Sequence, residues 1–296
     1  MNFDTIIDRT NTHAIKWDYR EKLFGKQDIL PMWVADMDFE SPPAVKNALH
    51  ARVEHGVFGY TGESKAYFRG IINWLQTRHN FPVKKEWLHY IPGVIPGLSF
   101  AIQAFSKPGD NVIIQPPVYK PFFSTVQNNE REVKTNPLKL VNGRYEMDFE
   151  DLEASIDENT KLLILCNPHN PVGRVWSKQE LEKLGDICLA NDILIVSDEI
   201  HFDIVYPGNA HTPIATLSDD LKSQTITLSS PGKTFNLQGF QSAYAIIPDQ
   251  QLSKGFQAIL DRNGIFMNNV LSITAVEAAY SHGKPWLGEL ITYLDG

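Results

Sequence analysis

The chain has 296 residues, of which 43% are hydrophobic and 21% are charged. This length exceeds that of one ordinary domain, so we expect a large domain with a buried core and part of a second domain. The formal net charge of -8 argues against a nucleic-acid partner, because binding along a phosphate backbone needs clustered Lys and Arg side chains.

The first forty residues show no long periodic pattern, and we expect them to form an arm. They contain the compact string Trp33-Val34-Ala35-Asp36-Met37-Asp38-Phe39. The N-terminus lacks the basic and apolar regions of a secretory signal, and no apolar run is long enough to span a bilayer. We therefore expect a cytoplasmic protein with no membrane partner.

Helices are expected over residues 41–55, with Ser41 as the N-cap, and over residues 63–79. Short apolar runs then alternate with helical stretches. The expected strands are 88–91, 111–115, 162–166, 193–197, 225–228 and 243–247, and expected helices begin near 94 and 121 and cover 177–190. This alternation predicts a three-layer α/β/α domain with a mostly parallel sheet covered on both faces.

The pattern becomes helical from residue 250, with expected helices at 250–261, at 268–282 and from Pro285 onward. The last has no stop signal other than Gly296 itself, so we expect a truncated second domain. The expected division is an arm with part of a small domain (1–40), a large domain (41–283) and the start of an interdomain helix (284–296), with the rest of the small domain absent. An exposed apolar patch is expected on that helix, around Trp286, Leu287 and Leu290.

Residues able to bind a ligand follow four of the expected strands. They are Val94 and Ile95 after 88–91, Asn170 after 162–166, Asp198 and His201 after 193–197, and Ser230 and Lys233 after 225–228. In an open α/β sheet, ligands bind outside the carboxyl ends of the strands. We therefore expect these residues to share one site.

Each of these side chains also has a purely structural explanation. Asn170 is typical of a turn, Asp198 of a helix cap, His201 of a satisfied core histidine and Lys233 of a solvated surface lysine. Unrelated structural needs, however, rarely place an amide, a carboxylate and an amine at three successive strand ends. The combination favours a shared chemical role.

That role suits an aldehyde cofactor with a pyridine ring and a phosphate. The amine of Lys233 in a partly desolvated pocket has a lowered pKa and condenses with a carbonyl. The carboxylate of Asp198 keeps a pyridine nitrogen protonated, so that the ring accepts electrons. Asn170 and His201 are expected to hydrogen-bond the ring hydroxyl.

The phosphate is expected to bind the backbone N–H groups of Val94 and Ile95 at a helix start, together with Ser230. The two cysteines, Cys166 and Cys188, stand in no metal-ligand spacing. We expect both to pack in the core, and we predict no metal site.

With these residues in place, the chain resembles fold-type I pyridoxal 5′-phosphate (PLP) enzymes of the class I/II aminotransferase superfamily, specifically the cystathionine β-lyase or cysteine C-S lyase subgroup. The matching strings are 33–38, 167–174, 197–203 and 233–236, in this order, and the match extends over essentially the whole chain. The WVADMD string at 33–38 is the most discriminating. The resemblance implies PLP as the cofactor and Lys233 as its Schiff-base lysine.

The resemblance assigns roles to two tyrosines. It implies that Tyr119 stacks on the pyridine ring. Without the resemblance, we would expect Tyr119 to be a half-buried aromatic side chain. It also implies that Tyr60 reaches the phosphate of the neighbouring subunit, so that a homodimer shares its active sites. The structural alternative for Tyr60 is a loop aromatic packed on the core.

The chain departs from the family pattern in three places. Gln241 stands eight residues after Lys233, where many aminotransferases have an arginine that grips the phosphate; glutamine fits the lyase subgroup. Gly232 precedes the lysine where the subgroup usually has a small hydroxyl residue. Family members also continue for about 100 residues, roughly another domain, which carry the arginine for the substrate α-carboxylate, and no residue here is assigned that role.

The implied function is a PLP-dependent C-S β-lyase of methionine biosynthesis that acts on an amino-acid substrate. Freed Lys233 removes the Cα proton, a thiolate leaves Cβ, and cystathionine or a related cysteine S-conjugate yields a thiol, pyruvate and ammonia. The alternatives are an aminotransferase on the same scaffold, or an inactive or regulatory fragment of such an enzyme.

Overall fold

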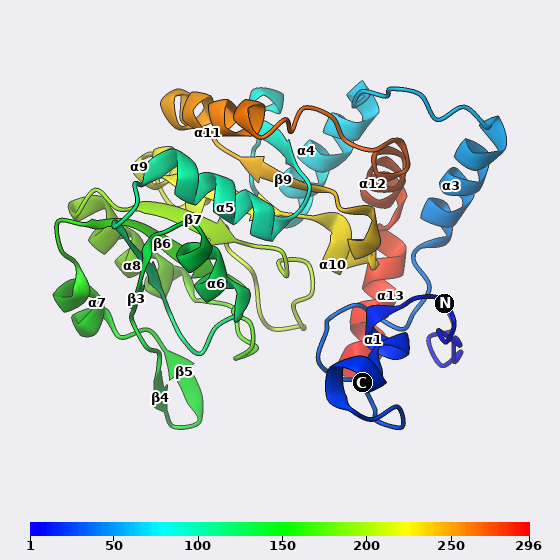
Figure 1. The fold of residues 1–296 in the computed structure, drawn as a ribbon, viewed down its shortest axis with the longest axis horizontal. Helices are drawn as coiled ribbons and strands as arrows, with labels where there is room; N and C mark the ends of the chain where they lie inside the picture. The colour runs from blue at the N-terminus through cyan, green and yellow to red at the C-terminus, as the bar shows by residue number, and fades with distance from the viewer.

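The computed structural model describes residues 1–296 and centres on a seven-stranded sheet of order β1-β9-β8-β7-β6-β2-β3 (Figure 1). Its strands are β1 (Leu88–Ile91), β2 (Asn111–Ile114), β3 (Glu132–Thr135), β6 (Thr160–Cys166), β7 (Leu194–Asp198), β8 (Thr225–Ser229) and β9 (Ala243–Ile246). Only β9 runs antiparallel to its neighbours. The other six strands therefore end at one edge, and the predicted mostly parallel sheet is confirmed.

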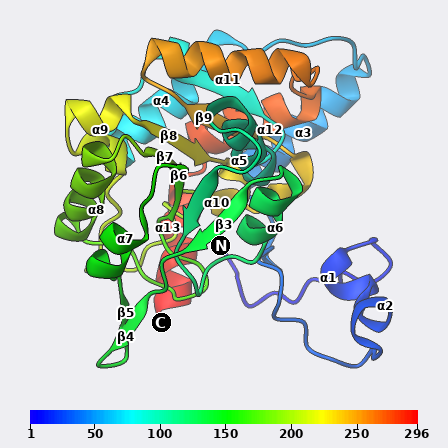
Figure 2. The same cartoon turned by 60° about the vertical axis from the view of Figure 1, so that its left-hand side comes forward.

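The central strands are nearly continuous apolar runs because both faces of the sheet are covered. One face packs against α5 (Val94–Phe105), α6 (Pro121–Asn128) and α11 (Gln250–Arg262). The other packs against α7 (Phe149–Ser155), α8 (Lys178–Ala190) and α9 (Asp219–Ser223). The three layers are visible in Figures 1 and 2.

A third helical group covers the β1–β9 end of the second face. It consists of α3 (Pro43–His55), α4 (Lys65–His79), α10 (Pro231–Phe235), α12 (Val270–His282) and α13 (Lys284–Asp295). Strand β9 serves both cores, since Ala243 and Ala245 face the first helical layer while Tyr244 and Ile246 face this group. The arm carries α1 (Ile15–Asp18) and α2 (Arg20–Phe24), which project from the main body in Figure 2.

The prediction of an exposed apolar patch on the last helix is wrong. Trp286, Leu287 and Leu290 are all buried. The ring of Trp286 packs against Phe235 of α10 and Phe3 of the arm, with centroids 6.2 and 5.9 Å away. The arm and the Lys233 helix therefore cover the apolar face of α13.

The expected cap of α3 is also wrong, because Pro42 precedes the helix as N-cap without a side-chain hydrogen bond. The Ser41 hydroxyl instead donates to the carbonyl of Asn236 at 3.1 Å. The sequence reading missed several short elements, whose few residues show no clear periodicity. They are β3, α7, α9, α10 and the hairpin of β4 (Lys139–Val141) and β5 (Arg144–Glu146).

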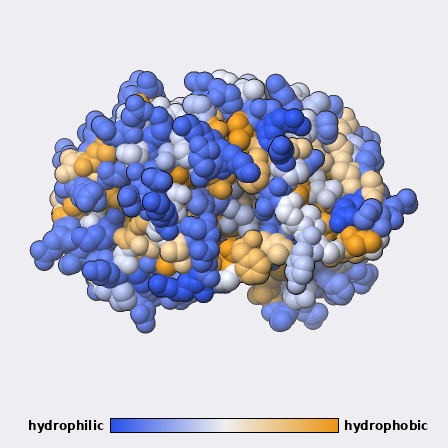
Figure 3. All heavy atoms as spheres, turned by 90° about the horizontal axis from the view of Figure 1, so that it is seen from above, coloured by the Kyte–Doolittle hydropathy of each residue, from blue (hydrophilic) through white to orange (hydrophobic).

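The surface seen from above in Figure 3 is mainly hydrophilic, with small scattered apolar patches. None of the helices combines the length and the hydropathy that a membrane crossing requires. Cys166 and Cys188 are both buried and unbridged, which confirms their predicted place in the core.

Candidate active site

A cavity of about 690 Å³ opens at the carboxyl edge of the sheet. It brings together every predicted site residue except Tyr60. The predicted residues in its lining are Val94, Ile95, Tyr119, Asn170, Asp198, His201, Ser230 and Lys233. They meet there because β1, β2, β6, β7 and β8 all end at this edge.

Lys233 lies on α10, a five-residue helix that follows β8 directly. Ser230 caps this helix, since its hydroxyl oxygen accepts a hydrogen bond from the N–H of Gly232 at 2.9 Å. Burial lowers the pKa of the Lys233 amine, an effect that the charges of Asp36 and Asp198 oppose. The neutral, nucleophilic amine is therefore more populated than on an exposed lysine.

Asp198 ends β7 and is 5% exposed. Its carboxyl accepts the N–H of Ile200 at 3.1 Å and forms no ion pair. Burial, more than any neighbouring charge, raises the pKa of Asp198 to about 7. A protonated ring nitrogen would supply the missing partner, so this carboxyl fits a pyridine cofactor.

His201 and Asn170 also line the cavity. Asn170 precedes Asp198 in the sequence and His201 follows it. Burial, together with the nearby charge of Lys233, lowers the pKa of His201 to about 4. The imidazole is therefore neutral near pH 7. The backbone N–H of Asn170 donates to the Cys166 sulfur at 3.4 Å, and both residues line the cavity.

Tyr119 lies beyond the end of β2 and is 40% exposed. Partial burial and the nearby charge of Asp198 raise the pKa of its phenol, which therefore stays neutral at ordinary pH. This half-buried aromatic supplies a flat apolar surface at the cavity. Its environment is compatible with stacking on a ring.

The opposite end of the cavity suits a phosphate. Val94 and Ile95 start α5, whose first backbone N–H groups have no partner within the helix. Gly97 lets α5 lie close to the sheet, because a Cβ there would overlap Ile91. These N–H groups are therefore held at the edge of the sheet, where they can donate hydrogen bonds to an anion.

Ser230 already uses its hydroxyl within the chain. It donates to the carbonyl of Ser242 at 2.7 Å while it caps α10. Donation to a phosphate would require that hydroxyl to turn. A Cβ on Gly232 would come 3.0 Å from the Ser230 oxygen, so glycine leaves that hydroxyl room.

Tyr60 lies outside this cavity, on the loop between α3 and α4, and is 97% exposed. Sequence reasoning also missed part of the lining. Trp33, Val34 and Ala35 form one side of the cavity, and Gln238 and Ser242 contribute from the segment after α10. Gln241, which the sequence singled out by its distance from Lys233, also lines the cavity. The WVADMD string was the available signal, since a distinctive string far from any strand suggests a site.

Comparison with known proteins agrees with this geometry. The sequence model of the family "Aminotransferase class I and II" matches residues 27–284. Cystathionine beta-lyase PatB of Bacillus subtilis (strain 168) is 49% identical over 296 residues, which are 100% of this chain and 76% of that protein.

Solved structures show the same relationship. A PLP-bound protein of Clostridium difficile 630 matches with a TM-score of 0.97 and 48% identity, over 99% of this chain and 76% of that one. The PLP-bound C-S lyase of Staphylococcus hominis matches with a TM-score of 0.93 and 37% identity, over 100% and 74%. The predicted family resemblance and fold type I are thus confirmed. The chain belongs to the class I and II aminotransferase family and is a PLP-dependent enzyme.

Proposed function

We propose that this chain is a C-S β-lyase that cleaves cystathionine or related cysteine S-conjugates. One substrate molecule and one water yield a thiol, pyruvate and ammonia. The observation that carries the proposal is the meeting of Lys233, Asp198 and Tyr119 in one cavity. The 49% identity to a cystathionine beta-lyase supports the substrate class.

When bound, PLP supplies an aldehyde that condenses with amines and a ring that accepts the electron pair left at the substrate Cα. Lys233 would hold the cofactor at rest and would then move the substrate Cα proton. Its lowered pKa suits this work, because a buried amine gives up its own proton more readily. Asp198 holds a proton at the ring nitrogen and stabilises the positive charge there.

The remaining residues orient the cofactor. Asn170 and His201 would hydrogen-bond the ring hydroxyl, and Tyr119 would pack on the ring; all three line the cavity. Val94 and Ile95 would bind the phosphate through the N–H groups at the start of α5. Ser230 would join them once its hydroxyl turns away from the Ser242 carbonyl.

We also propose a cytoplasmic homodimer with shared active sites. The support is the position of Tyr60, which is 97% exposed on a loop beside exposed Val57 and Phe58. Such an apolar loop is typical of a surface that a partner covers. In this arrangement Tyr60 would contact the phosphate in the active site of the neighbouring subunit.

The division of the chain into an arm, a large domain and the start of an interdomain helix, at residues 40/41 and 283/284, remains a prediction.

The function is tested by incubating the PLP-loaded protein with cystathionine and no keto acid. We expect pyruvate and a free thiol in equal amounts. Turnover that requires a keto-acid acceptor, with the aminated cofactor accumulating when the acceptor is absent, would identify an aminotransferase instead. Failure to take up PLP would contradict the proposed lyase activity.

The lysine assignment has its own test. Borohydride reduction of the PLP-loaded protein should fix the cofactor on Lys233, as located by peptide mass spectrometry. Lys120 lines the same cavity and is the internal control. A label on Lys120, or on Lys107, would show that the wrong amine has been assigned.

A further inference from the structure

Residues 33–39 are called here the wall segment, and its first three residues form one side of the cavity. Trp33, Val34 and Ala35 line the cavity of Lys233. Ala35 also borders two adjoining cavities, of about 430 and 340 Å³. The position of the wall segment therefore sets the shape of the space around Lys233.

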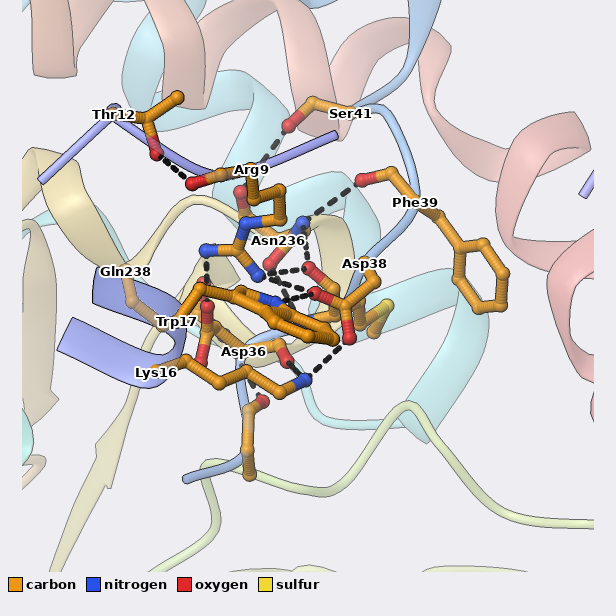
Figure 4. Close-up of polar contacts among 12 residues, drawn as sticks. Arg9, Thr12, Lys16, Trp17, Asp36, Asp38, Phe39, Ser41, Asn236 and Gln238 are labelled. Atoms are coloured by element: carbon orange, nitrogen blue, oxygen red, sulfur yellow. Dashed lines mark hydrogen bonds and ion pairs between the residues drawn. The ribbon is translucent and has the colours of Figure 1, made fainter. Parts of the chain in front are cut away.

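The side chain of Asn236 holds this segment through its backbone. Its Oδ1 accepts the N–H of Met37 at 3.0 Å, and its Nδ2 donates to the carbonyls of Met37 and Phe39, both at 3.0 Å. Figure 4 shows these contacts. The Gln238 side chain adds a hydrogen bond to the carbonyl of Ala35 at 3.3 Å.

Asn236 is also the residue that ends the Lys233 helix. It is the C-cap of α10 in the left-handed conformation, with φ of 58°. Asparagine tolerates this conformation better than most residues. One residue therefore terminates the helix that carries the reactive amine and binds the segment that faces it.

The arm fixes the other side of the wall segment through charged side chains. Arg9 contacts Asp36 at 2.5 Å and Asp38 at 2.7 Å, and Lys16 contacts Asp38 at 2.6 Å. These side-chain contacts restrain the segment relative to the arm. Arg9 and Lys16 also donate to the backbone carbonyls of Met37 at 3.2 Å and Asp36 at 3.0 Å. From the Lys233 side, Asn236 supplies three of the backbone hydrogen bonds, and Gln238 adds the fourth.

We propose that Asn236 is a positioning residue, whose side chain fixes the wall segment to the end of the Lys233 helix and thereby sets how the cavity binds its amino-acid substrate. It lies outside the cavity lining and touches no reacting atom. The inference rests on the proposed role of Lys233. Loss of the contact should weaken substrate binding more than it slows the chemical step.

The test is Asn236→Gly, because glycine keeps the left-handed backbone and removes only the side chain. The matched control is Asn80→Gly. Asn80 is the C-cap of α4, also left-handed with φ of 49°, and its side chain makes no hydrogen bond. Asn236→Asp is a second variant of unchanged size, which retains the acceptor for Met37 but cannot donate to either carbonyl.

Two readouts apply. Hydrogen exchange followed by mass spectrometry reports protection of the Met37 amide in peptides covering the wall segment, in the cofactor-free protein. Steady-state kinetics with cystathionine give KM and kcat separately. For Asn236→Gly, which removes the acceptor of the Met37 amide, we expect faster exchange in the segment. For both Asn236→Gly and Asn236→Asp, which lose the donation to the two carbonyls, we expect a KM about tenfold higher, with kcat changed less than about threefold.

Asn80→Gly should leave both readouts at the wild-type values. Unchanged exchange in the wall segment of Asn236→Gly would overturn the proposal, as would faster exchange with an unchanged KM. A wild-type protein that fails to label Lys233 would instead refute the proposed function. The exchange measurement in the cofactor-free protein does not depend on that outcome.

Discussion

Asp198 is a buried carboxyl whose ionisation is opposed by its surroundings. Its pKa is raised from 3.8 to about 7 in the folded protein. Between these values the unfolded chain loses this proton while the folded chain retains it. The contribution of Asp198 to stability is therefore full below about pH 4 and declines as pH rises toward 7.

This linkage predicts the behaviour of Asp198→Asn without cofactor. Relative to wild type, the free energy of unfolding of the variant should rise between pH 4 and 7. The limit is about 4 kcal/mol, at about 1.4 kcal/mol for each pKa unit. Urea unfolding across this pH range measures it. Glu158→Gln, at an exposed site, controls for the lost charge, and parallel curves for Asp198→Asn and wild type would refute the prediction.

The same residue is expected to matter for turnover. Asp198→Ala should lower the rate of Cα-proton exchange by about 10²–10³ while PLP is still bound, because a preorganised charge partner is lost. Exchange of the substrate Cα proton in deuterated water, followed by NMR, measures this step. A variant with the wild-type exchange rate would show that another carboxylate faces the ring.

At the scale of elements, Asp203 joins α4 to the Lys233 helix. Its fully buried carboxylate contacts the side chains of Arg78 at 2.7 Å and His79 at 2.8 Å and accepts a hydrogen bond from the indole N–H of Trp74. All three residues belong to α4. It also accepts the Thr234 hydroxyl of α10 at 2.7 Å. Asp203 is thus a structural carboxylate, and it is not a neutral comparison for Asp198.

Asp203→Ala should lower the free energy of unfolding by about 3–5 kcal/mol, because the buried side chains of Trp74, His79 and Thr234 would lose their acceptor and Arg78 its ion pair. Asp203→Asn should recover part of this loss. The midpoint of denaturant unfolding measures both. Asp219→Ala removes an exposed carboxylate paired with Lys222 and should change the midpoint little. A shift for Asp203→Ala as small as that of Asp219→Ala would contradict this account.

At the scale of the whole molecule, shared sites predict complementation between subunits. We mix Tyr60→Phe and Lys233→Ala chains under conditions where subunits demonstrably exchange. In a mixed dimer with shared sites, one site carries both changes and the other carries neither. Activity of the mixed dimer should therefore return to about half of the wild-type value, as measured by pyruvate formation.

A mixture no more active than the unmixed variants would show that Tyr60 serves its own chain or no site. Dilution provides an independent check. PLP affinity should fall as the dimer dissociates, because a ligand shared by two chains stabilises their association.

The sequence by itself determined the parallel sheet and those cavity residues that directly follow its strands. Continuous apolar runs such as 162–166 indicate strands buried on both faces, and the polar residues just after such strands must meet at one edge. Asn170, Asp198 and Lys233 could therefore be placed together without coordinates. Each of these inferences depends only on local periodicity and on the common direction of the strands.

Only the tertiary structure decided which distant segments pack together. Three examples join residues far apart in sequence. Trp286 packs against Phe3 and Phe235. Asn236 forms hydrogen bonds with Ser41 and with Met37. Such contacts leave no periodic signal in either segment. They arise because side chains from separate elements bury one another, which no local pattern of residues specifies.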